Sequence, residues 1–239
     1  MRKLVVLALA LAMAGVVLTK TAEDMFERPR RAMVAMQIKA RGISDPRILD
    51  AMGRIPRHLF VPPAYQSQAY ADHPLPIEEG QTISQPFIVA LMTEHLEVQE
   101  GDRILEIGTG SGYQAAVLAE LTPEVYSVEI RETLARQSAR TLEDLGYETV
   151  RVKHADGYYG WEEHAPFDGI MVTCAANHVP PPLLRQLKEG GRLIIPLGST
   201  SYFQTLTVIT KKDGKPRVRQ VLDVRFVPMV GEAEKKKGR

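Results

Sequence analysis

The run RILEIGTGSGYQAA, residues 103–116, decides the fold class of this 239-residue chain. An apolar strand pattern over 103–107 is followed by glycines at 108, 110 and 112, and a helix pattern then covers 111–121. Glycine adopts positive φ and lets a ligand approach the backbone, while the start of a helix presents unpaired N–H donors. The run therefore predicts a strand–turn–helix unit that binds a ligand at its turn.

The spacing of these glycines indicates which ligand the turn binds. A dinucleotide site requires a small residue at the sixth position, where this chain has Tyr113. The observed G-x-G-x-G, with an acidic residue just before it, is instead typical of S-adenosylmethionine sites, in which no pyrophosphate is held. A nicotinamide enzyme and a non-catalytic nucleoside-binding module stay open as alternatives. The predicted cofactor residues of this run are Glu106, Gly108, Thr109, Gly110, Ser111 and Gly112.

Acidic residues end the next two strands of the predicted sheet. Glu129 closes the strand 125–129, and Asp156 and Gly157 follow the strand 150–154. Ligands of open α/β sheets bind outside the carboxyl ends of the strands, where a carboxylate can accept bonds from a ribose diol. We therefore expect Glu129 at the ribose, and Asp156 with Gly157 at the adenine edge.

Strand and helix patterns alternate through the middle of the chain, which predicts an α/β fold with a doubly wound, Rossmann-like parallel sheet. Strands are expected at 103–107, 125–129, 150–154, 167–172 and 192–197, and helices at 84–96, 111–121, 131–145 and 182–188. Strands at 205–211 and 218–227 flank a turn, which predicts antiparallel strands at the C-terminal edge. The expected organisation is a leader over 1–22, a helical cap over 23–79, a Rossmann-like core over 80–198 and C-terminal strands with a basic tail over 199–239.

Composition limits the classes of partner. Arg2 and Lys3 precede an apolar run over 4–18, which predicts a secretory signal peptide or an uncleaved membrane anchor. A net charge of +1 without a basic stripe argues against nucleic acid. A single cysteine, Cys174, allows no intrachain disulfide, and the scattered histidines predict no metal site. Nothing in the composition indicates more than a monomer.

Ser84 lies in GQTISQP, residues 80–86, where a polar run meets an apolar helix with proline in its first turn. Three roles are open from the residues alone: a nucleophile, a helix N-cap, or a cradle for an anion at the helix start. No Ser-His-Asp or Cys-His arrangement accompanies it, which disfavours the nucleophile. One hydroxyl can cap the helix and hold an anion in turn.

Several runs together resemble one family. They are LPI at 75–77, GQTISQP at 80–86, LEIGTGSGYQAA at 105–116, VYSVE at 125–129, LKEGGRL at 187–193 and VRFVP at 224–228. In order and over roughly 33–230, they resemble the protein-L-isoaspartate (D-aspartate) O-methyltransferases, and GQTISQP narrows the resemblance from methyltransferases in general.

The resemblance implies methyl transfer from S-adenosylmethionine to the α-carboxylate of L-isoaspartyl and D-aspartyl residues in damaged proteins and peptides. Ser84 is then the catalytic residue, and Thr82, Ile83, Thr173, Cys174, Ala175, Val224, Arg225 and Phe226 hold the acceptor. Cys174 stands where the family usually has alanine, and Asn177-His178 replaces a proline-containing step, so a different small-molecule or protein acceptor stays open. The family is cytosolic, whereas the leader predicts export.

Overall fold

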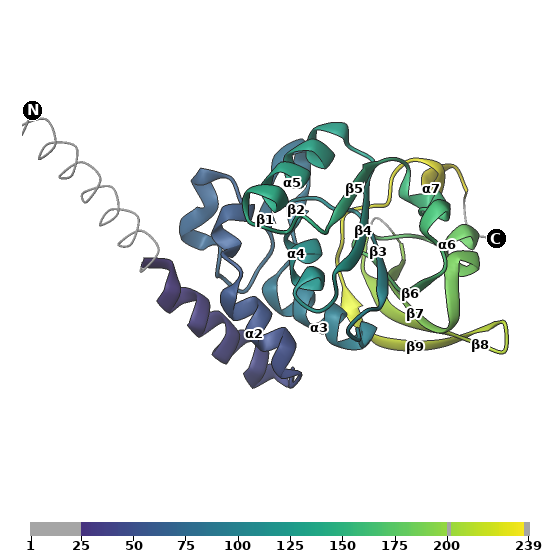
Figure 1. Cartoon of the computed structure of the whole chain (residues 1–239), viewed down its shortest axis with the longest axis horizontal. Helices are drawn as coiled ribbons and strands as arrows, with labels where there is room; N and C mark the ends of the chain where they lie inside the picture. Colours follow the sequence, from purple (N-terminus) through teal and green to yellow (C-terminus); the bar gives the residue numbers. More distant parts are fainter. Residues whose placement is uncertain (1–24, 200–201, 237–239) are drawn as a thin grey trace, which may run out of the picture.

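The computed structural model describes residues 25–199 and 202–236, so the predicted leader lies outside the described residues. One seven-stranded sheet, ordered β5-β4-β3-β6-β7-β8-β9, forms its centre (Figure 1). The strands are β3 (Arg103–Ile107), β4 (Glu124–Glu129), β5 (Arg151–His154), β6 (Phe167–Val172), β7 (Leu187–Gly198), β8 (Gln204–Lys212) and β9 (Lys215–Val224). Pairing is parallel from β5 to β7 and antiparallel from β7 to β9. The predicted fold class and antiparallel C-terminal edge are confirmed.

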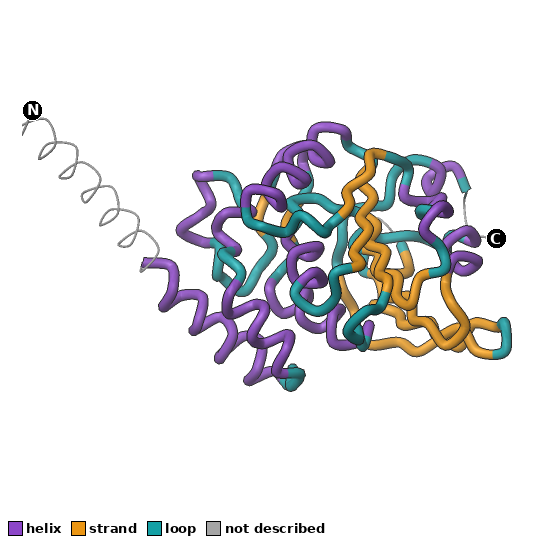
Figure 2. The backbone as a smooth tube through the Cα atoms, in the orientation of Figure 1, coloured by secondary structure: helices purple, strands orange, loops and turns teal. Residues whose placement is uncertain are grey.

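Helices cover both faces of this sheet (Figure 2). They are α3 (Pro86–Leu96), α4 (Tyr113–Ala119), α5 (Glu132–Asp144), α6 (Pro181–Gln186) and α7 (Glu232–Lys235), with short 3-10 turns η6 (Gly157–Tyr159) and η7 (Glu162–His164). Neighbouring strand residues point to opposite faces, so Ile104 packs in the core beneath α3 and α4 while Leu105 packs in the core beneath α6. Two apolar layers on one sheet explain why its central strands read as continuous apolar runs.

The residues before the sheet form a helical cap. Its elements are a helix over 25–32, η1 (Met33–Ile38), η2 (Lys39–Arg41), α2 (Pro46–Arg54), η3 (Arg57–Phe60), η4 (Pro63–Gln68), β1 (Leu75–Pro76), η5 (Glu78–Gly80) and β2 (Thr82–Ile83). Asp45 caps α2 by accepting a 2.9 Å bond from the Arg47 amide. Cap residues share one core cluster with α3 and α4. The boundary at residue 79 stays a prediction.

One predicted helix end is wrong. Gly190 and Gly191 do not terminate a helix over 182–188, because α6 ends at Gln186 and both glycines lie inside β7. The register of β7 against β6 shifts there, and a Cβ on Gly191 would lie 2.7 Å from the Asp168 carbonyl oxygen. Glycine at this position therefore allows the strands to approach closely and does not end a helix.

Within the described ranges no helix is long and apolar enough to cross a membrane.

Candidate active site

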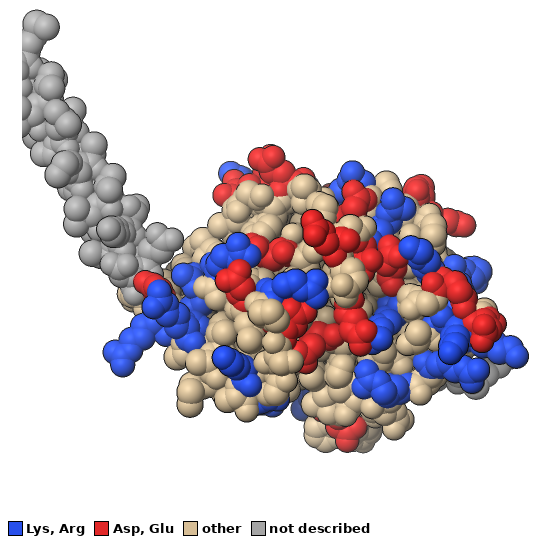
Figure 3. All heavy atoms as spheres, turned by 60° about the horizontal axis from the view of Figure 1, so that its bottom comes forward, with Lys and Arg blue, Asp and Glu red and all other residues tan. Residues whose placement is uncertain are grey.

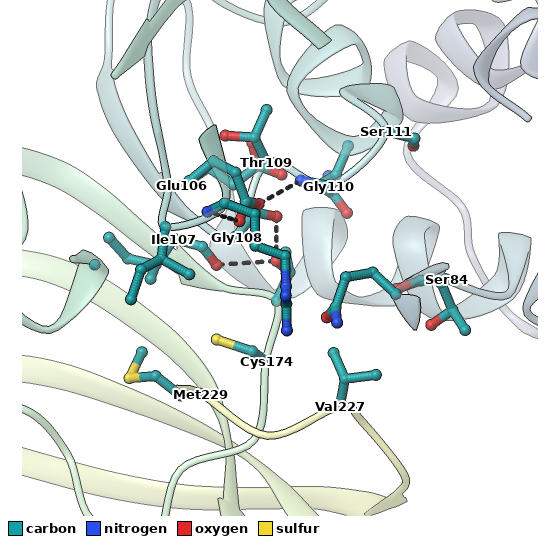
Figure 4. Close-up of a pocket in the computed structure, with 18 of the residues that line it drawn as sticks. Ser84, Glu106, Ile107, Gly108, Thr109, Gly110, Ser111, Cys174, Val227 and Met229 are labelled. Carbon is teal, nitrogen blue, oxygen red and sulfur yellow. Dashed lines mark hydrogen bonds between the residues drawn. The ribbon is translucent and has the colours of Figure 1, made fainter. Parts of the chain in front are cut away.

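A cavity of about 800 Å³, including its open mouth, lies at the carboxyl ends of β3, β4 and β6 (Figure 4). It is lined by twelve of the predicted site residues, namely Thr82, Ile83, Ser84, Glu106, Gly108, Thr109, Gly110, Ser111, Glu129, Gly157, Thr173 and Cys174. The predicted residues outside its lining are Gly112, Asp156, Ala175, Val224, Arg225 and Phe226. The fold thus brings the cap, the glycine turn and the β6 end to one place.

The glycine turn is held in a conformation that side chains would disturb. Gly108 and Gly110 have φ of 99° and 52°. A Cβ on Gly108 would lie 2.6 Å from the Thr173 hydroxyl, which donates to the Gly108 carbonyl at 2.7 Å. Gly112 faces away from the cavity, and its Cβ would meet Leu142 of α5 at 3.3 Å. Gly112 therefore allows helix packing, while Gly108 and Gly110 shape the cavity wall.

Glu106 presents an unpaired carboxyl oxygen to the cavity. Its side chain is fully buried, and the Ser127 hydroxyl donates to Oε2 at 2.5 Å while Thr109 bonds Ser127 at 2.6 Å. Among the described residues Oε1 has no hydrogen-bond partner. Burial raises the pKa of Glu106 to about 8, with Ser127 opposing and the Glu129 charge reinforcing the rise. The unpaired oxygen can bond a group of a ligand, and a cationic group there would offset the burial and favour the ionised carboxylate.

Glu129 and Asp156 end neighbouring strands but face different partners. The Glu129 carboxylate accepts the Gly110 and Arg131 amides, each at 2.9 Å, and lines the cavity with further lone pairs free for a diol. Asp156 instead accepts the Tyr158 amide at 2.9 Å and the Glu232 amide at 2.8 Å. Asp156 therefore ties the C-terminal segment to the sheet, and Gly157 alone of the predicted pair reaches the cavity.

The prediction that Ser84 caps α3 is wrong. The N-cap residue is Gln85, at φ −51° and ψ 137°, and no side chain caps this helix. Pro86 is the reason, because it forces the residue before it out of the helical region, so the helix starts one residue later than a Ser84 cap requires. The Ser84 side chain is left free to line the cavity (Figure 4).

A buried arginine that the sequence did not single out holds the Ser84 backbone. Arg57 is fully buried and donates from Nη2 to the Ser84 carbonyl and from Nε to the Ala69 carbonyl, both at 2.7 Å. Its guanidinium lies 4.7 Å from the centroid of the Tyr113 ring. Burial lowers the pKa of Arg57 to about 10, so it stays charged at neutral pH. Tyr113 lines the cavity and packs on Arg57.

The far wall comes from the chain after β9. The Ala175 amide donates to the Val227 carbonyl at 2.8 Å, and the Met229 amide donates to the Ala175 carbonyl at 2.7 Å. This pairing brings Val227 to Val230 to the cavity, rather than the predicted Val224 to Phe226. Burial, with the charges of Glu129 and Asp156, raises the pKa of the Cys174 thiol, so Cys174 is a neutral wall residue.

Sequence reasoning missed several lining residues, chiefly Gln81, Gln114, Ile130, Arg131, Met229 and Val230. Ile130 and Arg131 directly follow Glu129, so the strand end itself could have indicated them. Met229 and Val230 depend on the pairing with Ala175, for which the sequence offers no local signature. Within 25–199 and 202–236 no cluster of three or more potential metal ligands occurs.

A doubly wound sheet, a G-x-G-x-G turn after its first long strand and a carboxylate at the next strand end define a Rossmann-like S-adenosylmethionine-dependent methyltransferase. A family model described as Protein-L-isoaspartate(D-aspartate) O-methyltransferase (PCMT) matches residues 28–234. The chain belongs to this family.

Similar proteins cover most of the chain. A protein-L-isoaspartate O-methyltransferase 2 of Shewanella sediminis is 53% identical over 215 residues, covering 90% of this chain and 88% of the relative. One of Syntrophobacter fumaroxidans is 52% identical over 238 residues, covering 95% and 96%. A Plasmodium falciparum protein assigned to the same activity, solved with S-adenosyl-L-homocysteine, is 28% identical with a TM-score of 0.74, covering 84% and 98%. These similarities span the cap and the sheet together.

Proposed function

We propose that the cavity binds S-adenosylmethionine with Glu106 at the cationic methionine end and Glu129 at the ribose. The unpaired, buried Oε1 of Glu106 is the observation that carries this assignment, because a buried carboxyl oxygen needs a donor. Lone pairs of Glu129 beside the Gly110 amide suit a ribose diol. Gly157 and Ile130 supply the wall for the adenine, and the φ values of Gly108 and Gly110 let the ligand approach the turn.

The protein transfers a methyl group to the α-carboxylate of isoaspartyl residues, the activity of its family. The bound donor supplies a sulfonium-activated methyl group. An acceptor carboxylate has an ordinary pKa of about 3.5 to 4 and is ionised at neutral pH, so no general base is needed. What the chain must supply is alignment of the two groups and exclusion of water.

Ser84 is the proposed orienting group for the acceptor carboxylate. It lines the cavity beside Thr82 and Ile83, its hydroxyl caps no helix, and Arg57 fixes its backbone. A neutral hydroxyl can donate one hydrogen bond to the carboxylate without the overstabilisation that a cation would bring. Thr173 and Cys174 form the opposite side of the cavity, next to Val227. Ala175, Arg225 and Phe226 act behind this wall or at its rim.

The product follows from the family activity. In the methyl ester, the amide nitrogen of the following residue attacks the ester carbonyl and methanol leaves, which gives a succinimide. Water then opens the ring, and part of the product is normal aspartate. The test is transfer of label from methyl-labelled S-adenosylmethionine to an isoaspartyl peptide and to its aspartyl twin. Label in the isoaspartyl peptide alone is expected. Equal labelling of both peptides, or of neither, would refute the assignment.

The acceptor preference can be probed at Cys174. It lines the cavity where the family usually has alanine, and Asn177 and His178 lie beyond it and bond each other at 2.5 Å. The test measures methylation of isoaspartyl, D-aspartyl and small carboxylic acid acceptors by the native chain and by Cys174→Ala. A change in the rank order would assign preference to this wall, whereas an unchanged order places it elsewhere.

The site of action is proposed to be the cytosolic side of the membrane, where S-adenosylmethionine is made. The protein is proposed to act as a monomer, because the cavity is completed by residues of one chain. Cell fractionation with N-terminal sequencing tests the location and size-exclusion chromatography with light scattering tests the oligomeric state. An exported mature chain that begins near residue 22 would contradict the cytosolic assignment.

A further inference from the structure

The helical segment over 25–41 is fixed to the molecule by its inner side. Phe26 stacks on His58 with ring centroids 4.0 Å apart, and Met33 and Ile38 are fully buried. The Gln37 side chain donates to the Tyr70 carbonyl at 2.8 Å. These contacts determine which side chains of the segment face outward.

The outer face of this segment has an unusual composition. Its exposed residues are Met25, Arg28, Pro29, Arg31, Ala32, Ala35, Met36, Lys39, Ala40 and Arg41. The set is apolar and basic and contains no acidic residue. Met25 and Met36 are 64% and 71% exposed, which is high for side chains that gain from leaving water. Figure 3 shows blue side chains gathered at the N-terminal end of the described chain.

The basic residues of this face differ in how far the fold engages them. Arg41 pairs with Asp72 at 3.2 Å and lies 3.5 Å over the Phe87 ring, so it serves the cap. Among the described residues, Arg31 forms an ion pair with Glu27, one helical turn before it. Such exposed pairs on a helix contribute little to stability, so Arg31 remains available to another anion.

The sequence before this segment supplies a reason for the composition. An apolar run over 4–18 precedes it, with Arg2 and Lys3 on one side and Lys20, Arg28, Arg30 and Arg31 on the other. Basic residues with apolar neighbours are typical of helices that lie in the interface of an anionic membrane. The larger number of basic residues after the apolar run also favours the cytoplasmic side of a membrane for the segment that follows it.

We propose that the outer face of 25–41, hereafter the basic–apolar face, lies on an anionic lipid surface. The methionines enter the boundary of the acyl chains, and the arginines and Lys39 contact lipid phosphates. A second copy of this chain is a poor occupant, because two such faces would oppose arginine to arginine. None of these residues lines the cofactor cavity, so the inference is independent of the proposed function.

The test measures binding of the full chain to vesicles of phosphatidylcholine, alone and mixed with phosphatidylglycerol. The variant Arg28→Glu/Arg31→Glu is compared with Arg136→Glu/Arg140→Glu, which changes the net charge equally and also breaks exposed ion pairs on a helix, α5. Each basic residue near an anionic surface contributes roughly fivefold to binding. We expect the first variant to bind the anionic vesicles at least about 30-fold more weakly, and the control to change by less than about twofold.

A fluorophore reports which face meets the lipid. In a chain with Cys174→Ala, a label at Met36→Cys should be quenched by brominated lipids, whereas a label at the exposed Ala139→Cys of α5 should not. Methylation of a soluble isoaspartyl peptide should be the same for the Arg28/Arg31 variant and the native chain. The proposal is overturned by equal binding to both vesicle types, by equal weakening in the two charge variants, or by quenching that does not distinguish the two labels. Absence of any vesicle binding overturns it as well.

Discussion

Replacement of Glu106 by Gln removes a buried carboxyl group that lines the cavity and has one oxygen, Oε1, without a hydrogen-bond partner among the described residues. Glutamine has nearly the shape of a protonated glutamic acid and can keep an oxygen at the Ser127 hydroxyl. The substitution therefore removes the titration of Glu106 while leaving its packing in place. Its effects should depend on pH, in opposite directions for stability and for cofactor binding.

The pH dependence of stability follows from the raised pKa of Glu106. The ordinary value is 4.5 and burial raises it to about 8 in the folded protein. The stabilisation from the neutral carboxyl is complete below pH 4.5 and is lost as the pH rises towards about 8, because the unfolded chain ionises over this range while the buried group still holds its proton. Each pKa unit corresponds to about 1.4 kcal/mol, so the loss is at most about 5 kcal/mol. Glu106→Gln lacks this loss and should be the more stable chain at pH 9.

The effect of Glu106→Gln on cofactor binding has the opposite direction. A cationic ligand beside Glu106 favours the carboxylate, so binding at pH 7 should release a proton from the native chain but not from Glu106→Gln. A hydrogen bond between charged groups contributes about 1.5 to 3 kcal/mol, which predicts binding weaker by roughly 10- to 100-fold at pH 9 in the variant. At pH 6 both chains must start from a neutral group, so the difference should be smaller.

Calorimetry and denaturation measure both effects. Titration of S-adenosylmethionine in buffers of different ionisation enthalpy counts the protons released, and urea unfolding from pH 5 to pH 9 gives the stability curves. Glu124→Gln, a half-exposed carboxylate at the opposite end of β4, is the matched control and should follow the native chain. The same proton release and the same pH slope in the native and Glu106→Gln chains would refute the role of Glu106.

Three further substitutions test the rest of the site. Ser84→Ala should lower kcat on an isoaspartyl peptide by about 10-fold or more, because one hydrogen bond to a charged group is lost. The affinity for S-adenosylmethionine, measured by calorimetry, should change less than about twofold. Lost cofactor affinity with unchanged turnover would contradict the proposed role of Ser84. Arg57→Lys should destabilise the chain by about 2 to 4 kcal/mol in urea, because an ammonium cannot reproduce both carbonyl bonds. Asp156→Asn should cost about 1 to 3 kcal/mol, since one of the Tyr158 and Glu232 amides loses its acceptor; an unchanged urea midpoint would show that these bonds are dispensable.

The fold class could be read from the sequence because its indicators are local. Strand and helix periods alternate, and the glycine turn at 108–112 follows a strand directly, so neither depends on distant contacts. The sequence also predicted that Glu106, Glu129 and Gly157 lie close together, because parallel strands bring their carboxyl ends to one edge of the sheet. These are properties of spacing and topology, which a sequence contains.

The errors occurred where a distant segment or one neighbouring residue decides the outcome. Pro86 moved the start of α3 past the Ser84 cap, and the bulge against Asp168 placed Gly190 and Gly191 in a strand. To predict either outcome, one must know which of two competing local preferences of the chain prevails. The cavity residues after β9 lie a few positions beyond the predicted ones, because the backbone pairing with Ala175 brings this later part of the chain to the cavity. That pairing forms only once the sheet exists.

Arg57 shows why a site can depend on a residue that no motif marks. A fully buried guanidinium costs several kcal/mol of desolvation, and among the described residues its partners are two carbonyl oxygens and an aromatic ring rather than a carboxylate. A hydrophobic side chain of similar volume would avoid that cost, so stability alone does not account for an arginine here. What the arginine adds is geometry, because its two donors hold the carbonyls of Ala69 and Ser84 in fixed relation over Tyr113. The loop that carries the proposed acceptor hydroxyl is thereby tied to the cap on one side and to the cofactor wall on the other, so the cap contributes alignment to the reaction as well as apolar surface to the core.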